Sequence, residues 1–372
     1  MRTYCTAYKI TMSSPDDISQ LEALIERGEF RADEIVCIIC KTEGNGRVND
    51  FSRPLAHRCF RDLISQQTKK SAAEVDNSVA FVMSGGCEGI ITPHATIFVK
   101  RNSKETPSKP QKRLSFATAN TRELLPEELG TETHVRLVAE AVRSARAGAK
   151  IPDLTDVHYV QVKCPLLTTE RINDAKSRRR TTVTEDTLRS MGFSNGASAL
   201  GIALGLGEIK DFDPKHICTN PEIYTTRGGC SSGIELMNCQ IFVLGNSADS
   251  DSPFVSGHHR LDDMIDADGV RKALQNAGLQ VSGSLDAESR ARVLNVFGKA
   301  QVPLDGLVRG RRTTLLTDSD LNTRPARAVL GTLIASVVGD PAIYASAGWG
   351  YHQGPTGGGM AAAIVAVDKP SS

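Results

Sequence analysis

The chain has 372 residues, of which 40% are hydrophobic and 23% are charged, a composition typical of ordinary globular proteins. Its 44 basic and 43 acidic side chains leave a formal charge of +1, which excludes the broad positive field of most proteins that bind nucleic acid or anionic membranes. We therefore expect no nucleic-acid partner, and the length allows two or three domains.

The apolar runs at residues 329–338 and 360–367 are far shorter than the ~20 residues that cross a bilayer, so no membrane partner is expected. Residues 1–14 lack the basic start and apolar core of a secretory signal. Nine scattered cysteines fit reduced thiols better than a disulfide framework. These features predict a cytoplasmic protein.

Three long stretches repeat one order of elements, βαβαββ. The first has predicted strands at residues 4–11, 35–41, 79–83 and 95–99, and helices at 18–25 and from Arg53 onward. The second has predicted strands at 113–119, 157–163, 223–226 and 240–244, and helices at 134–146 and 196–206. The third lacks a clear first strand and has predicted helices at 270–276 and 325–338, and strands at 292–299, 342–345 and 361–367.

The repeat has a period of roughly 120 residues, which is too long for a solenoid unit. We therefore predict an α/β (α+β) fold of three pseudo-symmetric repeats around a shared axis. The polar segments 102–112 and 247–256 are predicted to be exposed connectors. They divide the chain into repeat A (1–105), repeat B (112–250) and repeat C (255–368).

Aligning the three stretches places a lysine at the end of each central strand and a serine in the turn after the next strand. The lysines are Lys41, Lys163 and Lys299, and the serines open Ser84-Gly85-Gly86, Ser231-Ser232-Gly233 and Ser346-Ala347-Gly348. Taken singly, each is more typical of a solvated strand end or a tight turn. Their recurrence favours serine–lysine dyads, in which a lysine acts as base only after burial or nearby positive charge lowers its pKa.

The second helix of each stretch is predicted to begin at a short polar segment. These segments are residues 51–54, 193–196 and 322–325, which carry Arg53, Asn195 and Arg324. Helix N-termini offer free N–H groups, and arginines add forked donors, so the three starts would form an oxygen-binding ring. Plain helix capping by Ser52, Ser194 and Thr323 explains the same pattern and is compatible with it.

Together these residues resemble the cyanuric acid hydrolase and barbiturase family of cyclic amide hydrolases. The matching segments are residues 40–46, 49–53, 81–86, 160–168, 191–204, 231–235, 308–312, 318–324 and 352–359. The resemblance implies a β-barrel-like core, one substrate on the axis and a homotetramer. It also implies hydrolysis of a cyclic imide, either cyanuric acid to carboxybiuret and then biuret and carbon dioxide, or barbiturate to a ureidomalonate, with no cofactor required for the chemistry.

The resemblance also implies roles for individual residues. Ser231 would be the nucleophile and Lys163 its general base, with backbone N–H groups near Ser231 and Ser232 receiving the oxyanion. Spacing alone does not single out this pair. The remaining expected substrate-binding residues are Lys41, Arg53, Ser84, Gly85, Asn195, Lys299, Arg324, Ser346 and Ala347.

Two positions depart from the family pattern. Asn195 stands where the second repeat usually carries arginine, and Gln301 falls on the family's metal-binding glutamate. A structural Mg²⁺ or Ca²⁺ near Gln301, Gln353, Gly354 and Pro355 is therefore disfavoured, because such ions prefer an anionic oxygen ligand. We expect cyanuric acid to be preferred over barbiturate, and a non-catalytic ligand-binding member is the competing interpretation.

Overall fold

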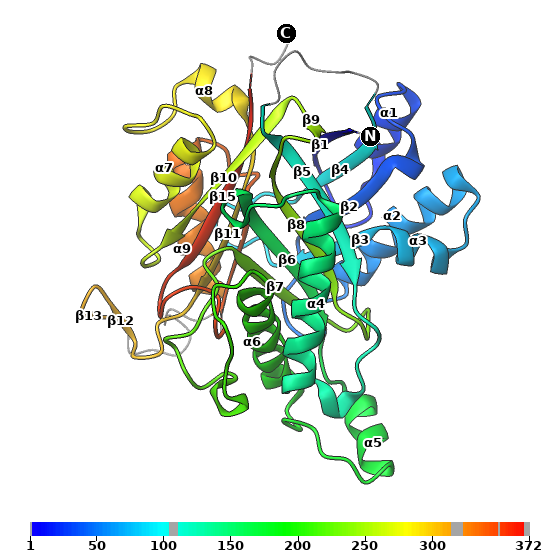
Figure 1. Ribbon diagram of the computed structural model, residues 1–372, viewed down its shortest axis with the longest axis vertical. Coiled ribbons are helices and arrows are strands. Elements are labelled where there is room, and N and C mark those ends of the chain that lie inside the picture. The colour runs from blue at the N-terminus through cyan, green and yellow to red at the C-terminus, as the bar shows by residue number, and fades with distance from the viewer. Residues whose placement is uncertain (1, 104–110, 314–322, 349, 368–372) are drawn as a thin grey trace.

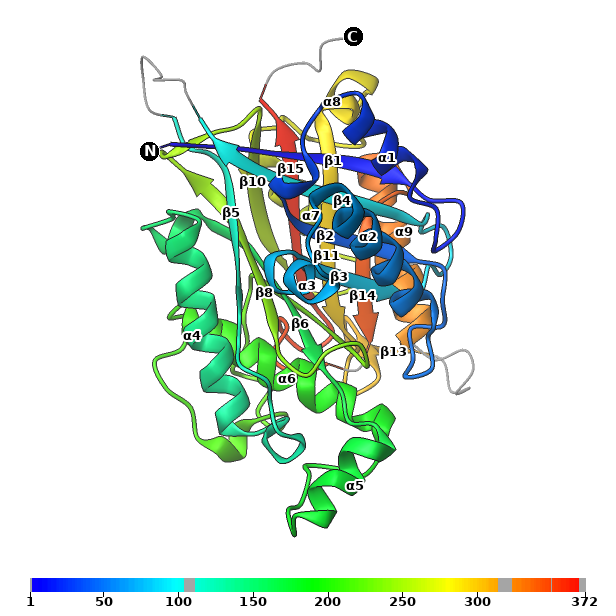
Figure 2. The same ribbon diagram turned by 90° about the vertical axis from the view of Figure 1, so that its right-hand side faces the viewer.

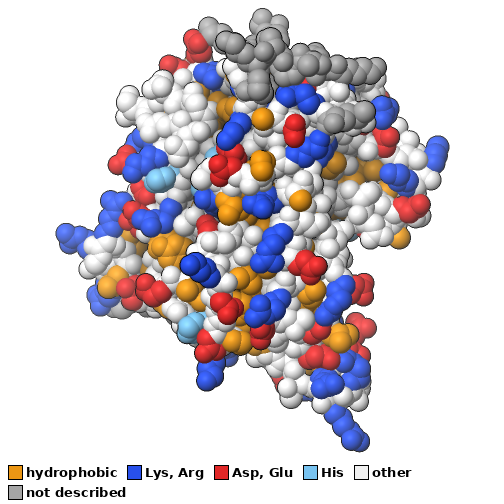
Figure 3. Space-filling view, in the orientation of Figure 1, with side chains coloured by type: hydrophobic (Ala, Val, Ile, Leu, Met, Phe, Trp, Pro, Cys, Tyr) orange, Lys and Arg blue, Asp and Glu red, His pale blue; other side chains and the backbone are white. Residues whose placement is uncertain are grey.

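The computed structural model describes residues 2–103, 111–313, 323–348 and 350–367. Within these ranges, three sheets form the centre of the molecule and helices lie outside them (Figures 1 and 2). No helix there is long and apolar enough to span a membrane. Basic and acidic side chains are interspersed over the face in Figure 3, in keeping with the balanced charge.

The first sheet has the strand order β3-β2-β4-β1-β9. Its strands are β1 (Thr3–Thr11), β2 (Ile35–Thr42), β3 (Ala80–Gly85), β4 (His94–Asn102) and the two-residue β9 (Ser250–Asp251). Its helices are α1 (Ser19–Glu26), α2 (Ser52–Thr68) and α3 (Ala72–Ser78). Strand β2 runs parallel to β3 and antiparallel to β4.

The other two sheets have the orders β5-β8-β6-β7 and β10-β15-β11-β14. The second consists of β5 (Arg113–Asn120), β6 (Val157–Pro165), β7 (Gly228–Gly233) and β8 (Gln240–Ser247), with helices α4 (Glu132–Gly148), α5 (Thr169–Ser177) and α6 (Thr187–Gly205). The third consists of β10 (Phe254–Leu261), β11 (Val293–Gln301), β14 (Tyr344–Gly348) and β15 (Gly359–Ala366), with helices α7 (Ala267–Asn276), α8 (Ala287–Arg292) and α9 (Thr323–Val338). A small hairpin, β12 (Leu307–Val308) and β13 (Arg311–Arg312), lies apart from the sheets.

Both faces of each sheet are buried, which explains why the central strands are apolar almost throughout. In β2, Ile38 and Cys40 face the core under α2, whereas Cys37 and Ile39 face a core that all three sheets share. Side chains alternate along a strand, so the two cysteines lie on opposite faces. The shared core contains the aromatic residues Phe98, Phe116, Tyr159, Phe242, Phe297 and Tyr344.

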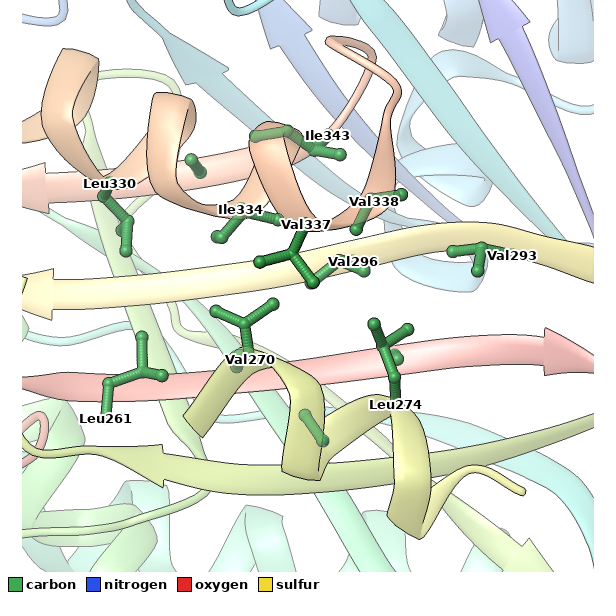
Figure 4. Close-up of a cluster of buried hydrophobic side chains, with 14 of the residues drawn as sticks. Leu261, Val270, Leu274, Val293, Val296, Leu330, Ile334, Val337, Val338 and Ile343 are labelled. Carbon is green, nitrogen blue, oxygen red and sulfur yellow. The ribbon is translucent and has the colours of Figure 1, made fainter. Parts of the chain in front are cut away.

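A separate core lies between each sheet and its own helices. Figure 4 shows the one in the third sheet, where Leu330, Ile334 and Val337 of α9 point toward strand β11, which carries Val296. These helical residues recur every three or four positions and so share one face. The sheets are thereby held between a common interior and three outer helical layers.

Strand register brings the predicted lysines and serines together in pairs. Each central strand lies parallel to the strand that carries its serine, with Lys41 opposite Ser84, Lys163 opposite Ser231 and Lys299 opposite Ser346. The proposed repeat boundaries and barrel-like closure stay predictions.

Three sequence predictions in the second and third stretches were wrong. Residues 223–226 form no strand, and the strand that follows them is β7. A glycine is needed at position 228 because a Cβ there would lie 2.8 Å from Ile202. Helix α6 begins at Thr187 rather than Gly196, because Asp186 caps it by accepting from two backbone N–H groups. The third stretch does have a first strand, β10.

Two smaller predictions also need correction. Segment 247–256 is not simply an exposed connector, since it contains β9 and the start of β10. Ser52 does not cap α2: its hydroxyl donates to Asp50 at 2.5 Å. Ser194 lies within α6 and caps nothing. The segments 104–110 and 314–322, the side chain of Thr323, and Trp349 lie outside the described residues, and so do the parts of the predicted connector 102–112 and helix start 322–325 that fall there.

Candidate active site

A cavity of about 200 Å³ lies where the serine-bearing strands of all three sheets end. Ten of the predicted substrate or catalytic residues line it: Arg53, Ser84, Gly85, Asn195, Ser231, Ser232, Lys299, Arg324, Ser346 and Ala347. Lys41 and Lys163 do not line the cavity but are fully buried next to their serines. The structure therefore brings the predicted lysines and serines to one place.

The three lysines differ in what their amines contact. Lys41 Nζ donates to Ser84 Oγ at 3.3 Å, and Lys299 Nζ donates to Ser346 Oγ at 3.1 Å and to the Cys230 carbonyl at 3.0 Å. Lys163 Nζ instead lies 2.7 Å from Glu235 Oε1 and donates to the Met83 carbonyl at 2.8 Å.

Burial sets the protonation of these amines. Removal from water lowers the pKa of Lys41 to about 8 and that of Lys299 to about 8. Burial also lowers the pKa of Lys163, but the Glu235 carboxylate opposes this by stabilising the ammonium. In turn, burial raises the pKa of Glu235, but Lys163 and Arg53 outweigh that effect and lower it.

The serines differ correspondingly. Ser84 and Ser346 accept hydrogen bonds from ammonium groups, whereas among the described residues Ser231 Oγ has no side-chain or backbone partner. Ser231 is partly exposed to the cavity. Its oxygen lone pairs are therefore free for another group.

The predicted clamp residues have distinct positions. Arg53 is buried and links two walls of the cavity, donating to the Ser232 carbonyl at 3.0 Å and to the Arg47 carbonyl at 2.6 Å. Asn195 comes from the interior of α6, not from a helix N-terminus as predicted, and accepts a 3.5 Å hydrogen bond from the Cys164 thiol. Arg324 is exposed in the first turn of α9.

Several lining residues were not predicted. They are Asn45, Gly46, Arg47, Leu188, Met191, Gly192, Cys230, Arg327 and Gly348. Arg327 is buried and binds Glu88 through two nitrogens, and it lies three residues after Arg324 on the same helix face. That spacing was a signal that could have identified it. Gly46 has φ +66°, and a Cβ there would lie 2.8 Å from the Arg327 guanidinium.

Glu235 is the second functional candidate that sequence reasoning missed. It lies in segment 231–235, which carries part of the family resemblance, but the predicted roles in that segment fall on Ser231 and Ser232. Its place four residues after Ser231 was visible, but nothing in the sequence indicated that its carboxylate folds back onto Lys163.

The region where the family resemblance would place a cation, which the sequence disfavours, has contacts that do not suit a divalent ion. Gln301 Nε2 donates to the carbonyls of Gly354 at 2.7 Å and Pro355 at 2.9 Å, so the amide occupies the oxygens that would ligate a metal. Gln353 Oε1 is engaged by the Cys230 N–H at 2.9 Å. Among the described residues, no group of three or more His, Cys, Asp or Glu side chains could hold a metal.

Comparisons with known proteins place this geometry in a family. The model of the amidohydrolase ring-opening protein family matches residues 6–366. A cyanuric acid amidohydrolase from Enterobacter cloacae is 47% identical over 362 residues, covering 96% of this chain and 98% of the relative. Barbiturase 1 from a Nocardioides species is 42% identical over 364 residues, covering 96% of this chain and 97% of the relative.

A solved cyanuric acid hydrolase structure superposes with a TM-score of 0.93 at 40% identity, covering 99% of this chain and all of the other. The family resemblance and the α/β class predicted from the sequence are thus confirmed. The chain belongs to the ring-opening amidohydrolase family and is a hydrolytic enzyme.

Proposed function

We propose that the protein is a cyanuric acid hydrolase that opens the ring to carboxybiuret, which then loses carbon dioxide to give biuret. The observation that carries this proposal is the convergence of three lysine–serine pairs on one small cavity. A planar ring with three equivalent carbonyls matches three sets of hydroxyl donors. The relative with 47% identity, named a cyanuric acid amidohydrolase, supports this substrate.

In the proposed reaction, Ser231 Oγ adds to one ring carbonyl carbon and its proton passes to the neutral amine of Lys163. The C–N bond of the tetrahedral intermediate then breaks, and the ring nitrogen leaves with the proton that Lys163 had taken, which restores the neutral amine. Water hydrolyses the resulting carbamoyl ester, which releases carboxybiuret and restores Ser231. Backbone N–H groups near Ser231 and Ser232 are proposed to stabilise the oxyanion.

The other two dyads are proposed to bind rather than react. Lys41 and Lys299 donate to Ser84 and Ser346, so each serine oxygen is engaged and its O–H is free to donate into the cavity. Those hydroxyls would hold the two carbonyls that are not attacked. Arg53 would act by fixing the cavity wall, because its two terminal nitrogens already bind backbone carbonyls.

Barbiturate is the second candidate substrate. Asn195 is shorter than the arginine usual in the family and carries no charge, and a relative at 42% identity is named a barbiturase. The test is ring opening of both compounds by the purified protein, with biuret and ureidomalonate identified by mass. Faster turnover of cyanuric acid is expected. Turnover of barbiturate alone would contradict the preference, and tight binding with no product from either ring would favour a non-catalytic member.

We also propose that no divalent cation is needed and that the enzyme works in the cytoplasm as a homotetramer. The Gln301 contacts support the first point. All nine cysteines are free thiols, seven of them buried, which suits a reducing compartment. Sedimentation of the purified enzyme tests the tetramer, and activity after chelation tests the cation.

A further inference from the structure

The residue four positions after each site serine differs among the three sheets. It is Glu88 after Ser84, Glu235 after Ser231, and Gly350 after Ser346. Glu88 binds Arg327 and makes no ion pair with Lys41 among the described residues. Only in the second sheet does this position place a carboxylate on the central lysine.

The fold accommodates this carboxylate closely. Glu235 is nearly fully buried, and a Cβ at Gly233 would lie 2.0 Å from Glu235 Oε2, so the glycine leaves the room that the carboxylate occupies. Besides Lys163, the charges that act on Glu235 are those of Arg53 from α2 and Arg171 from α5.

The contact with Glu235 determines the direction of the Lys163 amine. Lys163 Nζ is held between Glu235 and the Met83 carbonyl and shares no hydrogen bond with Ser231 Oγ in the described structure. The amines of Lys41 and Lys299, which have no carboxylate partner there, bind their own serines. The same strand register therefore gives two different arrangements, and the acid is what differs.

We propose that Glu235 is the positioning residue that makes the second dyad the reactive one, by stabilising the ammonium that Lys163 becomes when it takes the Ser231 proton. In the reactive form the Lys163 amine is neutral, and as Ser231 Oγ bonds to the carbonyl carbon the proton moves from Oγ to Nζ, so that the ammonium is again paired with Glu235. The charge created on the lysine thus meets a carboxylate already in place. This assignment rests on the proposed function of Ser231 and Lys163.

The first test needs only the wild-type enzyme, labelled with ¹³C at the lysine ε carbons and titrated by NMR. The groups that act on Lys163 are Glu235, Arg53 and Cys164, and only Glu235 is a nearby carboxylate. Lys163 is therefore expected to keep its proton to higher pH than Lys41 and Lys299. Titration of Lys163 at or below the other two would overturn the proposal.

The second test is the variant Glu235→Gln, which removes the charge and keeps the shape. The rising limb of the pH–kcat profile is expected to move to lower pH by about 1 to 3 units, because the neutral amine is reached earlier. The plateau is expected to fall at least about tenfold, because the new ammonium is less stabilised. If the rising limb of the pH–kcat profile of Glu235→Gln stayed at the wild-type pH, the proposal would be contradicted at any value of the plateau kcat.

Two further variants serve as controls. Glu88→Gln changes the acid at the same place in the first sheet, where it binds Arg327, so the limb should not move even if binding weakens. Glu235→Asp keeps the charge and should leave the limb closer to the wild-type pH than Glu235→Gln does. If the wild type opens neither ring, the proposed function fails, and the NMR titrations of the wild type and Glu235→Gln alone decide the role of Glu235.

Discussion

Ser231 differs from Ser84 and Ser346 in what its oxygen contacts, although all three lie opposite a buried lysine. An ammonium that donates to a serine oxygen withdraws electron density from it, so Ser84 and Ser346 are poor nucleophiles while their lysines are charged. Ser231 has no such donor among the described residues. The physical difference between the three hydroxyls agrees with the role that the family resemblance implies.

Replacing the serines one at a time should separate reaction from binding. Ser231→Ala is expected to lower kcat by about 10³-fold or more, because it removes the hydroxyl that is proposed to form the ester. Ser346→Ala, the matched control, should mainly raise KM, by about tenfold for one lost hydrogen bond to substrate. Steady-state kinetics at fixed pH measures both. A larger loss of kcat in Ser346→Ala than in Ser231→Ala would move the nucleophile to the third sheet.

Substrate binding should weaken as the pH rises through about 8. Burial lowers the pKa of Lys41 and Lys299 to about 8, so below that pH their ammonium groups donate to Ser84 and Ser346. Above it, the neutral amines can accept instead, and the hydroxyls turn away from the substrate. KM, corrected for ionisation of the substrate, should therefore rise between about pH 7 and pH 9. The rise in KM should be smaller in Ser346→Ala. A wild-type KM that does not change between about pH 7 and pH 9 would contradict the prediction.

Among the secondary-structure elements, the central strands were the most predictable and the glycine-rich parts the least. Buried strands such as β2 and β6 are long apolar runs, so their extent and their terminal lysines could be read from the sequence. Strand β7 is a run of Gly, Cys and Ser whose low strand propensity hides it, because its extended form is imposed by close neighbours. Helix α6 was predicted to begin nine residues too late, because segment 193–196 was matched to the polar helix starts of the other two stretches, whereas the helix begins at Thr187.

The candidate site, like the secondary structure, was predictable only in part. Lysines and serines at fixed places in repeated elements could be aligned, so all six were identified. No role could be assigned to Glu235, because its contact with Lys163 depends on how the segment after β7 folds back onto the end of β6. The spacing from Arg324 could have indicated Arg327, but not its partner Glu88, which follows a strand of another sheet. Spacing along one chain segment does not determine such contacts.

The hydrogen bonds from Gln301 of β11 to segment 350–359 lead to a prediction about cation binding. In the wild type, the Gln301 amide donates to two carbonyls, and chelators should leave activity unchanged. Gln301→Glu replaces that donor with a carboxylate, which repels the same carbonyls unless a cation lies between them. The variant should melt at lower temperature than the wild type in EDTA and regain stability with Mg²⁺ or Ca²⁺. Equal melting with and without cation would show that the carboxylate does not build a site.

At the scale of the whole molecule, the site is built where three sheets meet, and it requires three lysines to be buried there. Each sheet contributes aromatic or aliphatic residues to the shared core, so all three must be in place before the cavity exists. A buried ammonium opposes folding, whereas a buried ion pair opposes the loss of either partner. The three lysines should therefore affect stability with different signs.

Lys41→Met should raise the free energy of unfolding at pH 7 by roughly 3 kcal/mol, since the pKa of Lys41 falls from its ordinary value to about 8 on folding. Because the pKa of Lys41 is lower in the folded state, the buried ammonium reduces the free energy of unfolding of the wild type at pH values below about 8. This destabilisation disappears as the pH rises above about 8. Lys163→Met should instead lower the free energy of unfolding by about 3 kcal/mol, because Glu235 is left buried without its partner. Urea unfolding of both variants checks this, and shifts of the same sign would contradict it.

Strand β9 lies far along the chain from β1 but pairs with its first residues. Ser250 pairs with Thr3 and Asp251 with Tyr4, and the Asp251 carboxylate accepts from Arg2 Nε at 3.0 Å. During synthesis, therefore, one edge of β1 stays uncovered until Ser250 and Asp251 have been made. If residues 1–105 were excised as a separate fragment, that bare edge would be permanent and open to pairing with neighbouring copies.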